Sequence, residues 1–176
     1  FFPDAQGQPT SAKALTGNAA MEEARRLLDN GKPIEARALL VRAFQDDTAH
    51  VGDQFKVTPS ESRTQAMVLM AEANRRIRTL DPMEASLQKS QVALDDGDIR
   101  LADKHARAVA KSATATPEQA GAAQNLLARI DQRRGELAPL AGDALMQAER
   151  DFLAGRYAEA KSGLAMVDRS GAKLTE

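Results

Sequence analysis

The side chains that could take part in metal or acid–base chemistry are few and widely separated in this chain of 176 residues. It has two histidines, His50 and His105, and no cysteine. His50 lies in a polar stretch, and His105 lies inside a predicted helix with no histidine or acidic residue four positions later. A metal site needs several such ligands on one face. The sequence therefore predicts no metal site.

Adjacent carboxylates occur at Glu22–Glu23, Asp46–Asp47 and Asp95–Asp96. Neighbouring residues of a helix point in different directions, so these pairs do not share a proton as a catalytic dyad does. The segment Asp95-Asp96-Gly97-Asp98 lacks the alternating ligands and the final glutamate of an EF-hand calcium loop. The chain has no glycine-rich phosphate loop and no Gly-x-Ser-x-Gly turn. We predict no catalytic residue, no cofactor and no enzymatic activity.

Positive and negative side chains almost balance, with 24 lysines and arginines against 25 aspartates and glutamates. A chain so close to neutral has no long-range field that would attract DNA or anionic lipid. The pairs Arg75–Arg76 and Arg133–Arg134 lie late in predicted helices, where cations suit the negative end of the helix dipole. No apolar run approaches the roughly 20 residues of a membrane-spanning helix. We predict no nucleic-acid partner and no membrane span in this segment.

The apolar residues are those of helices rather than strands. Aromatic residues make up only 3% of the chain, and Ala, Leu and Met carry the predicted core. Their helical spacing indicates an all-α fold. Met67, Met70 and Met83 could form a soft peptide-binding surface, but Met70 continues the stripe of its helix, which favours core packing. Eight helices are expected, over about 18–30, from Pro33, over 59–79, from Pro82, from Asp98, over 117–135, from Pro139 and around Tyr157.

Two short segments are typical of helix starts. Asp81-Pro82-Met83-Glu84 and Thr116-Pro117-Glu118-Gln119 each combine a capping side chain, a proline at the first helical position and a Glu or Gln that can reach back to the cap. Between the helices we interpret residues 46–58 as a loop. Residues 1–17 are interpreted as a flexible arm, 18–170 as one helical-repeat domain, and 171–176 as a tail or the start of a continuation.

Three segments can be laid over one another without gaps. In each, a glycine has a small residue seven positions before it, a large apolar residue three before it and an alanine five after it. The small residue and the alanine let two antiparallel helices approach closely, and the glycine takes the tight turn between them. We expect the large residues to be buried anchors. The positions are Ala24, Leu28, Gly31 and Ala36, then Ser90, Leu94, Gly97 and Ala102, then Ala148, Phe152, Gly155 and Ala160.

The third copy, Gly155-Arg156-Tyr157-Ala158-Glu159-Ala160, resembles the Gly–x–aromatic–x–x–Ala step of the tetratricopeptide repeat family. That family repeats about every 34 residues, whereas the three glycines here lie 66 and 58 residues apart. The extra length holds one further helix per unit, and Leu69-Met70-Ala71 aligns with Leu126-Leu127-Ala128 in these two helices. The repeat is also similar to N-terminal extensions of bacterial envelope proteins, including secretin-like channel subunits.

These observations predict a right-handed α-solenoid of about eight antiparallel helices, in which three glycine-turn hairpins alternate with an extra helix. For its function we expect a non-enzymatic scaffold or adaptor that binds other proteins within a larger bacterial envelope assembly. A periplasmic or extracellular location is favoured. The alternative is a structural subunit that self-assembles into a filament, ring or lattice, because the ends of an open repeat can stack head to tail.

Overall fold

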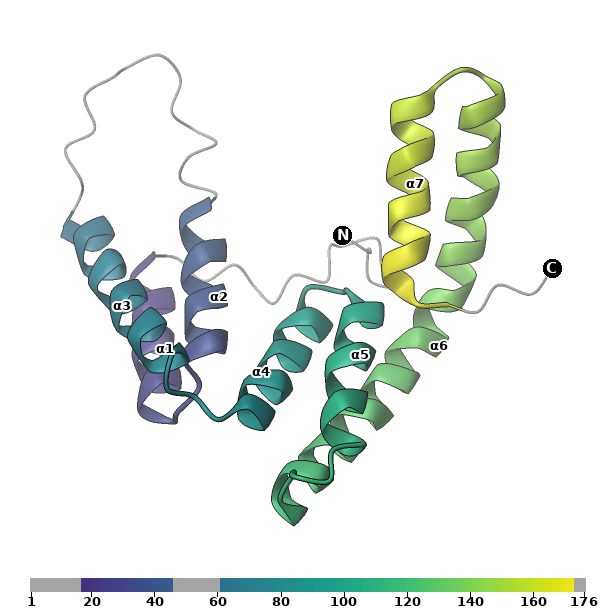
Figure 1. Ribbon diagram of the computed structural model, residues 1–176. Helices are drawn as coiled ribbons and strands as arrows, with labels where there is room; N and C mark the ends of the chain where they lie inside the picture. Colours follow the sequence, from purple (N-terminus) through teal and green to yellow (C-terminus); the bar gives the residue numbers. More distant parts are fainter. Residues whose placement is uncertain (1–16, 46–60, 173–176) are drawn as a thin grey trace.

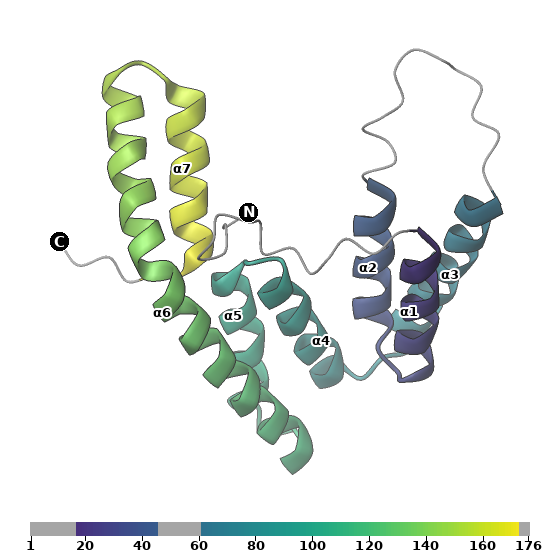
Figure 2. The same cartoon turned by 180° about the vertical axis from the view of Figure 1, so that it is seen from behind.

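The computed structural model describes residues 17–45 and 61–172 of the chain. These residues form α-helices and no strand, which confirms the all-α class. Figures 1 and 2 show the helices from opposite sides. In chain order they are α1 (Gly17–Asp29), α2 (Pro33–Gln45), α3 (Glu61–Ile77), α4 (Pro82–Asp95), α5 (Ile99–Ala110), α6 (Pro117–Leu153) and α7 (Tyr157–Ser170).

Some predicted features lie outside the described residues. The predicted loop over 46–58, the helix start at Pro59 and nearly all of the predicted arm over 1–17 fall there, as do residues 173–176. Within the part of the tail that is described, Gly171 has a φ angle of 59° and ends α7 in the left-handed conformation. A glycine adopts this conformation without the steric cost that a side chain would add.

Helices α4 and α6 begin at the two predicted start signals. The Asp81 carboxylate accepts hydrogen bonds from the backbone N–H of Met83 at 2.9 Å and of Glu84 at 3.0 Å. At α6, Thr116 Oγ1 accepts from the Gln119 N–H at 3.2 Å, and Gln119 Oε1 accepts from the Thr116 N–H at 3.0 Å. These bonds satisfy N–H groups that have no partner inside the helix. Gln119 Nε2 also donates to Asp81 at 3.0 Å, which ties the two helix starts together.

The predicted helix start at Pro139 is wrong, because Pro139 lies inside the continuous helix α6. The described residues therefore hold seven helices where about eight were expected. Proline removes one backbone N–H and crowds the carbonyl four residues earlier, which belongs here to Gly135. Burial of Leu137 and Ala141 on either side keeps both halves packed as one helix. Figure 1 shows α6 changing direction between these halves, the distortion that an internal proline produces.

Two hydrophobic cores hold the helices together. The first lies among α1, α2 and α3, and the second lies among α4, α5 and α6. Both are rich in alanine, which lets helices approach closely. Helix α4 also packs against α2, and α7 packs against α6 and α5. The first core contains Met21, Ala24, Leu28, Ala36, Leu40, Ala66 and Ala73; the second contains Leu87, Ala93, Ile99, Ala102, Ala106, Val109, Ala123, Leu126, Ile130 and Leu137.

We expect the substitution Pro139→Ala to raise the free energy of unfolding by about 2 kcal/mol, because alanine restores the missing N–H and removes the ring. The Pro139 side chain is exposed, so no core packing is lost. Pro117→Ala is the matched control, since a proline at the first position of a helix replaces an N–H that has no helical partner. Urea unfolding followed by circular dichroism measures both. Unchanged stability in Pro139→Ala would show that the proline does not strain α6.

Candidate functional site

The three repeat glycines make the same turn. Gly31, Gly97 and Gly155 have φ angles of 72°, 71° and 77°. Each glycine N–H donates to the carbonyl three residues earlier, at 3.0, 3.1 and 3.0 Å. The next N–H donates to the carbonyl five residues earlier, at 2.8 Å in every copy. This pair of bonds is the Schellman motif, which satisfies the last carbonyls of a helix while the chain reverses.

The small residues of the repeat lie inside the hairpins. The residue seven before each glycine and the alanine five after it are buried in all three copies. In the third copy, a Cβ added at Gly163 would lie 3.0 Å from the Cβ of Ala148, so α6 and α7 approach too closely for a larger side chain there. These positions therefore hold the two helices of each hairpin together. They are Ala24, Ala36, Ser90, Ala102, Ala148 and Ala160.

The predicted burial of the large residue three before each glycine holds for Leu28 and is wrong for Phe152. Leu28 belongs to the first core, where α3 covers it, and Leu94 is half-buried against the second core. Phe152 is 62% exposed. The difference has a physical reason, because α3 covers the first hairpin and the first half of α6 covers the second. Helix α5 contacts the hairpin formed by α7 and the second half of α6 near the C-terminal end of α7, through Arg100 and Asp168. No third helix among the described residues covers the part of this hairpin that holds Phe152.

Two further repeat positions behave in the same way, and the first of them is the aromatic position of the tetratricopeptide-like step. Two residues after the glycine, Pro33 and Ile99 are buried but Tyr157 is 65% exposed. Nine residues after it, Leu40 and Ala106 are buried but Leu164 is 51% exposed. The sequence analysis did not align the second position across the copies, and counting nine residues from each glycine would have found it. Both positions mark the surface that another helix covers in the first two copies and leaves bare in the third.

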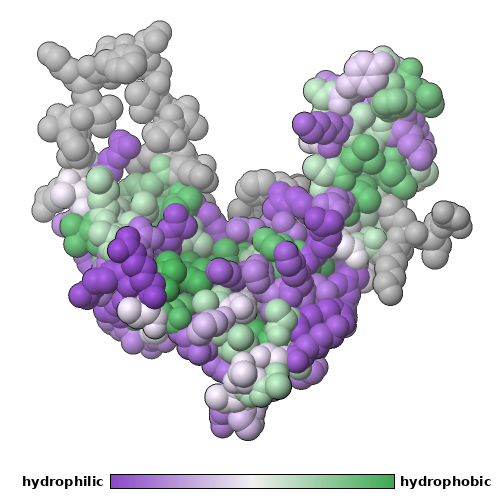
Figure 3. Space-filling model, viewed as in Figure 1, coloured by the Kyte–Doolittle hydropathy of each residue, from purple (hydrophilic) through white to green (hydrophobic). Residues whose placement is uncertain are grey.

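We call the three exposed residues Phe152, Tyr157 and Leu164 the third-hairpin face. The rings of Phe152 and Tyr157 meet edge to face, with centroids 5.5 Å apart. Exposed Met146 and Leu153 add apolar surface to the same hairpin. Figure 3 shows apolar side chains exposed on the upper part of the α6–α7 hairpin. Clustered exposed apolar residues of this kind are typical of a surface that binds another protein.

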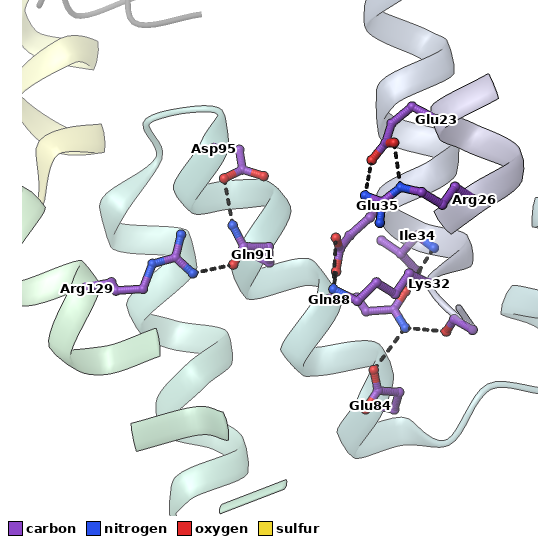
Figure 4. Close-up of polar contacts among 11 residues, drawn as sticks. Glu23, Arg26, Lys32, Ile34, Glu35, Glu84, Gln88, Gln91, Asp95 and Arg129 are labelled. Atoms are coloured by element: carbon purple, nitrogen blue, oxygen red, sulfur yellow. Dashed lines mark hydrogen bonds and ion pairs between the residues drawn. The ribbon is translucent and has the colours of Figure 1, made fainter. Parts of the chain in front are cut away.

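The turn of the first hairpin is covered by a buried side chain of α4, Gln88 (Figure 4). Gln88 Oε1 accepts from the Ile34 N–H at 3.1 Å, and Gln88 Nε2 donates to the Gly31 carbonyl at 2.9 Å. Nε2 also donates to the Glu84 carboxylate at 3.1 Å. One amide thus satisfies a free donor and a free acceptor of the turn, as buried polar groups require. The sequence has no local signal for this contact, because the partners lie more than 50 residues apart.

The turn of the second hairpin is covered by α7 in a similar way. Arg169 Nη2 donates to the Asp96 carbonyl at 3.0 Å, and Arg100 pairs with Asp168 at 2.9 Å. At the third turn, Arg156 Nε donates to Asp151 of the same hairpin at 2.9 Å. Every residue from 152 to 159 is exposed. Within residues 17–45 and 61–172, the third hairpin thus has neither the covering helix nor the covered turn of the first two.

The carboxylates with raised pKa values lie at the junction of α2 and α4, which Figure 4 shows. Burial raises the pKa of Glu35 although Lys32 lies 3.3 Å away, and burial raises the pKa of Asp95 although Gln91 donates to it at 2.7 Å. Gln91 also accepts from Arg129 at 2.7 Å. Each carboxylate has a partner three or four residues away, Lys32 for Glu35 and Gln91 for Asp95. No group of acidic residues or histidines within the described residues is arranged to hold a metal ion.

The other candidate side chains have structural partners or lie outside the described residues. Glu72 bonds both Arg75 and Arg76, which lowers its pKa to about 2. His105 has a lowered pKa, caused first by burial and then by nearby lysines. His50 lies outside the described residues. The remaining arginine pair is also bonded to carboxylates: Arg133 to Glu136, and Arg134 to Asp103.

The three methionines of the sequence analysis do not share one surface. Met70 packs against the first core and Met83 against the second, whereas Met67 is exposed on α3.

Comparison of the chain with protein-family models, with curated proteins and with solved structures found no match. In the part of the chain that the structure describes, no helix has the length and apolar character needed to cross a membrane.

Replacing a turn glycine tests the repeat directly. We expect Gly31→Ala to lower the free energy of unfolding by about 1 kcal/mol, because its φ of 72° is costly for a residue with a side chain. Gly121→Ala is the matched control, since Gly121 lies inside α6 with open space around it. There alanine should stabilise the helix by up to about 1 kcal/mol. Denaturant unfolding measures the change in the free energy of unfolding for both variants. Changes of the same sign in Gly31→Ala and Gly121→Ala would contradict the turn geometry.

The shifted carboxylates predict opposite pH dependences. Because the pKa of Glu35 is raised above 4.5, its ionisation opposes folding, and stability is lost as pH rises through the folded-state value. Because the pKa of Glu72 is lowered to about 2, its ionisation favours folding above 4.5, and that contribution is lost as pH falls. Glu35→Gln should therefore gain stability relative to the parent as pH rises from about 3 to 8. Glu72→Gln should lose stability relative to the parent over the same pH range. If the unfolding free energies of both variants followed the parent at a constant difference across this range, the pKa shifts of Glu35 and Glu72 would be refuted.

Proposed function

We propose that this protein is a non-enzymatic scaffold that binds a protein partner through the third-hairpin face. One observation carries the proposal. Positions that are covered by another helix in the first two hairpins are bare in the third, and there they hold Phe152, Tyr157 and Leu164. Large aromatic and aliphatic side chains at such positions are the usual anchors of protein interfaces.

The repeat supports the same conclusion. A single helical hairpin cannot bury its apolar face alone, so each unit needs a neighbour. Helix α3 supplies that neighbour to the first hairpin, and the first half of α6 supplies it to the second. We propose that the units follow one another as a right-handed α-solenoid, and that the third hairpin is the end at which the next element docks. Binding would then continue the packing that holds the chain together.

A binding role accounts for the polar groups as well. The shifted carboxylates Glu35, Asp95 and Glu72 each have a partner three or four residues away in the chain. Their arrangement requires no reaction to explain it. Membership of a bacterial envelope assembly and a periplasmic or extracellular location stay predictions of the sequence resemblance.

Site-specific crosslinking tests this function. A photo-crosslinking amino acid placed at Leu164 should give discrete protein adducts in an extract of the cells that make the protein. The control position is Gln124, which is exposed on α6 away from the third hairpin. Adducts at 164 that are missing at 124 would support the binding surface. No adduct at 164, or the same adducts at both positions, would contradict it.

A further inference from the structure

Helix α3 has a second apolar surface besides the one that covers the first hairpin. Its inner residue Ala66 is buried, but Met67 is 62% exposed and Val68 is 64% exposed. Ala71, one turn further along, is exposed as well. We call Met67, Val68 and Ala71 the outer face of α3. Such a face is shaped for close contact with another helix, because its side chains are apolar and its last residue is small.

The repeat provides an internal control for this face. When Leu69-Met70-Ala71 is aligned with Leu126-Leu127-Ala128, Met67 corresponds to Gln124 and Val68 to Asn125. Gln124 and Asn125 are equally exposed. The first half of α6 thus has polar residues at two of the three outer-face positions, and the third, Ala71, aligns with the exposed Ala128. Met67 and Val68 are thus apolar at exposed positions where the corresponding helix has polar residues, which indicates that the outer face of α3 has a partner of its own.

On this basis we propose that the outer face of α3 from a second copy of the chain packs onto the third-hairpin face. The chain carries a hairpin that lacks its covering helix and a helix with a spare apolar face, so one contact between copies covers both. The position that α3 takes on the first hairpin is the position that is empty on the third. Met67 would bring its sulfur against the rings of Phe152 and Tyr157, a favourable pairing.

This contact joins two copies rather than two parts of one copy. Figures 1 and 2 both show α3 and α7 at opposite ends of the described helices. The two surfaces are different, so the contact is heterologous, and each copy keeps one free α3 face and one free third-hairpin face. Assembly is therefore head to tail, and it ends in a ring if the rotation between copies closes and in a filament if it does not. The inference rests on the proposed function, since it names the partner of the same surface.

Sedimentation velocity over a wide concentration range tests the contact. The parent chain should form species larger than a monomer, and Val68→Glu or Tyr157→Glu should each weaken association at least thirtyfold, the loss typical of an interface hot spot. Both side chains are exposed, so circular dichroism spectra and unfolding midpoints should match the parent. Leu101→Glu, at an exposed apolar position of α5, is the control and should assemble as the parent does.

Mixing the two variants gives the sharpest result. Val68→Glu keeps an intact third-hairpin face, and Tyr157→Glu keeps an intact α3 face. The mixture should therefore form a one-to-one heterodimer and nothing larger, because the two faces left over both carry the Glu substitution. A parent chain that stays monomeric at every concentration overturns the proposal. So does association that Tyr157→Glu abolishes and Val68→Glu leaves intact, because two third hairpins would then pair with each other.

The outcome separates this inference from the proposed function. If the parent is monomeric but the crosslinker at Leu164 captures a different protein, the scaffold function stands and the self-contact fails. If the crosslinker captures only further copies of the chain and the mixture forms the heterodimer, the self-contact stands and the role as a scaffold for other proteins fails.

Discussion

A left-handed glycine at the end of the first helix of each hairpin is the constraint on which the rest of the structure depends. With φ near 72° at Gly31, the chain reverses while the last carbonyls of α1 keep their hydrogen bonds. The two helices are then close enough for Ala24 and Ala36 to be buried together. The same turn directs other residues, such as Leu28 and Leu40, outward from the hairpin, where a further helix has to cover them.

The cover that the first two hairpins receive comes from later in the chain. Gln88 of α4 closes the first turn and Arg169 of α7 closes the second, so each of these two units is completed by its successor. Cores rich in alanine bury little apolar surface per residue, and polar contacts of this kind fix how the units meet. The third hairpin has no successor among the described residues. Its exposed aromatic pair is therefore a consequence of the same rule that organises the rest of the chain.

Local chemistry made much of this architecture predictable. The helix caps at Asp81 and Thr116 and the glycine turns each depend on a few neighbouring residues. The structure contains the caps and the turns. The prediction failed at Pro139, where a helix-start signal was overridden by burial of Leu137 and Ala141 on the same helix. It failed at Phe152 because a repeat pattern treats its copies as equal, whereas burial depends on which copy has a neighbour. Contacts such as Gln88 with the Gly31 turn join distant residues and leave no local pattern.

Amide hydrogen exchange on the dilute chain tests the central claim, that covering by a neighbour completes each hairpin. Amides of α7 near Tyr157 and Leu164 should open at a lower free energy than amides at the same repeat positions in α2 and α5. Raising the protein concentration should then protect the α7 amides selectively, together with those around Val68. Equal protection of all three hairpins in the dilute monomer would contradict the account, since the third hairpin would then be complete without a neighbour.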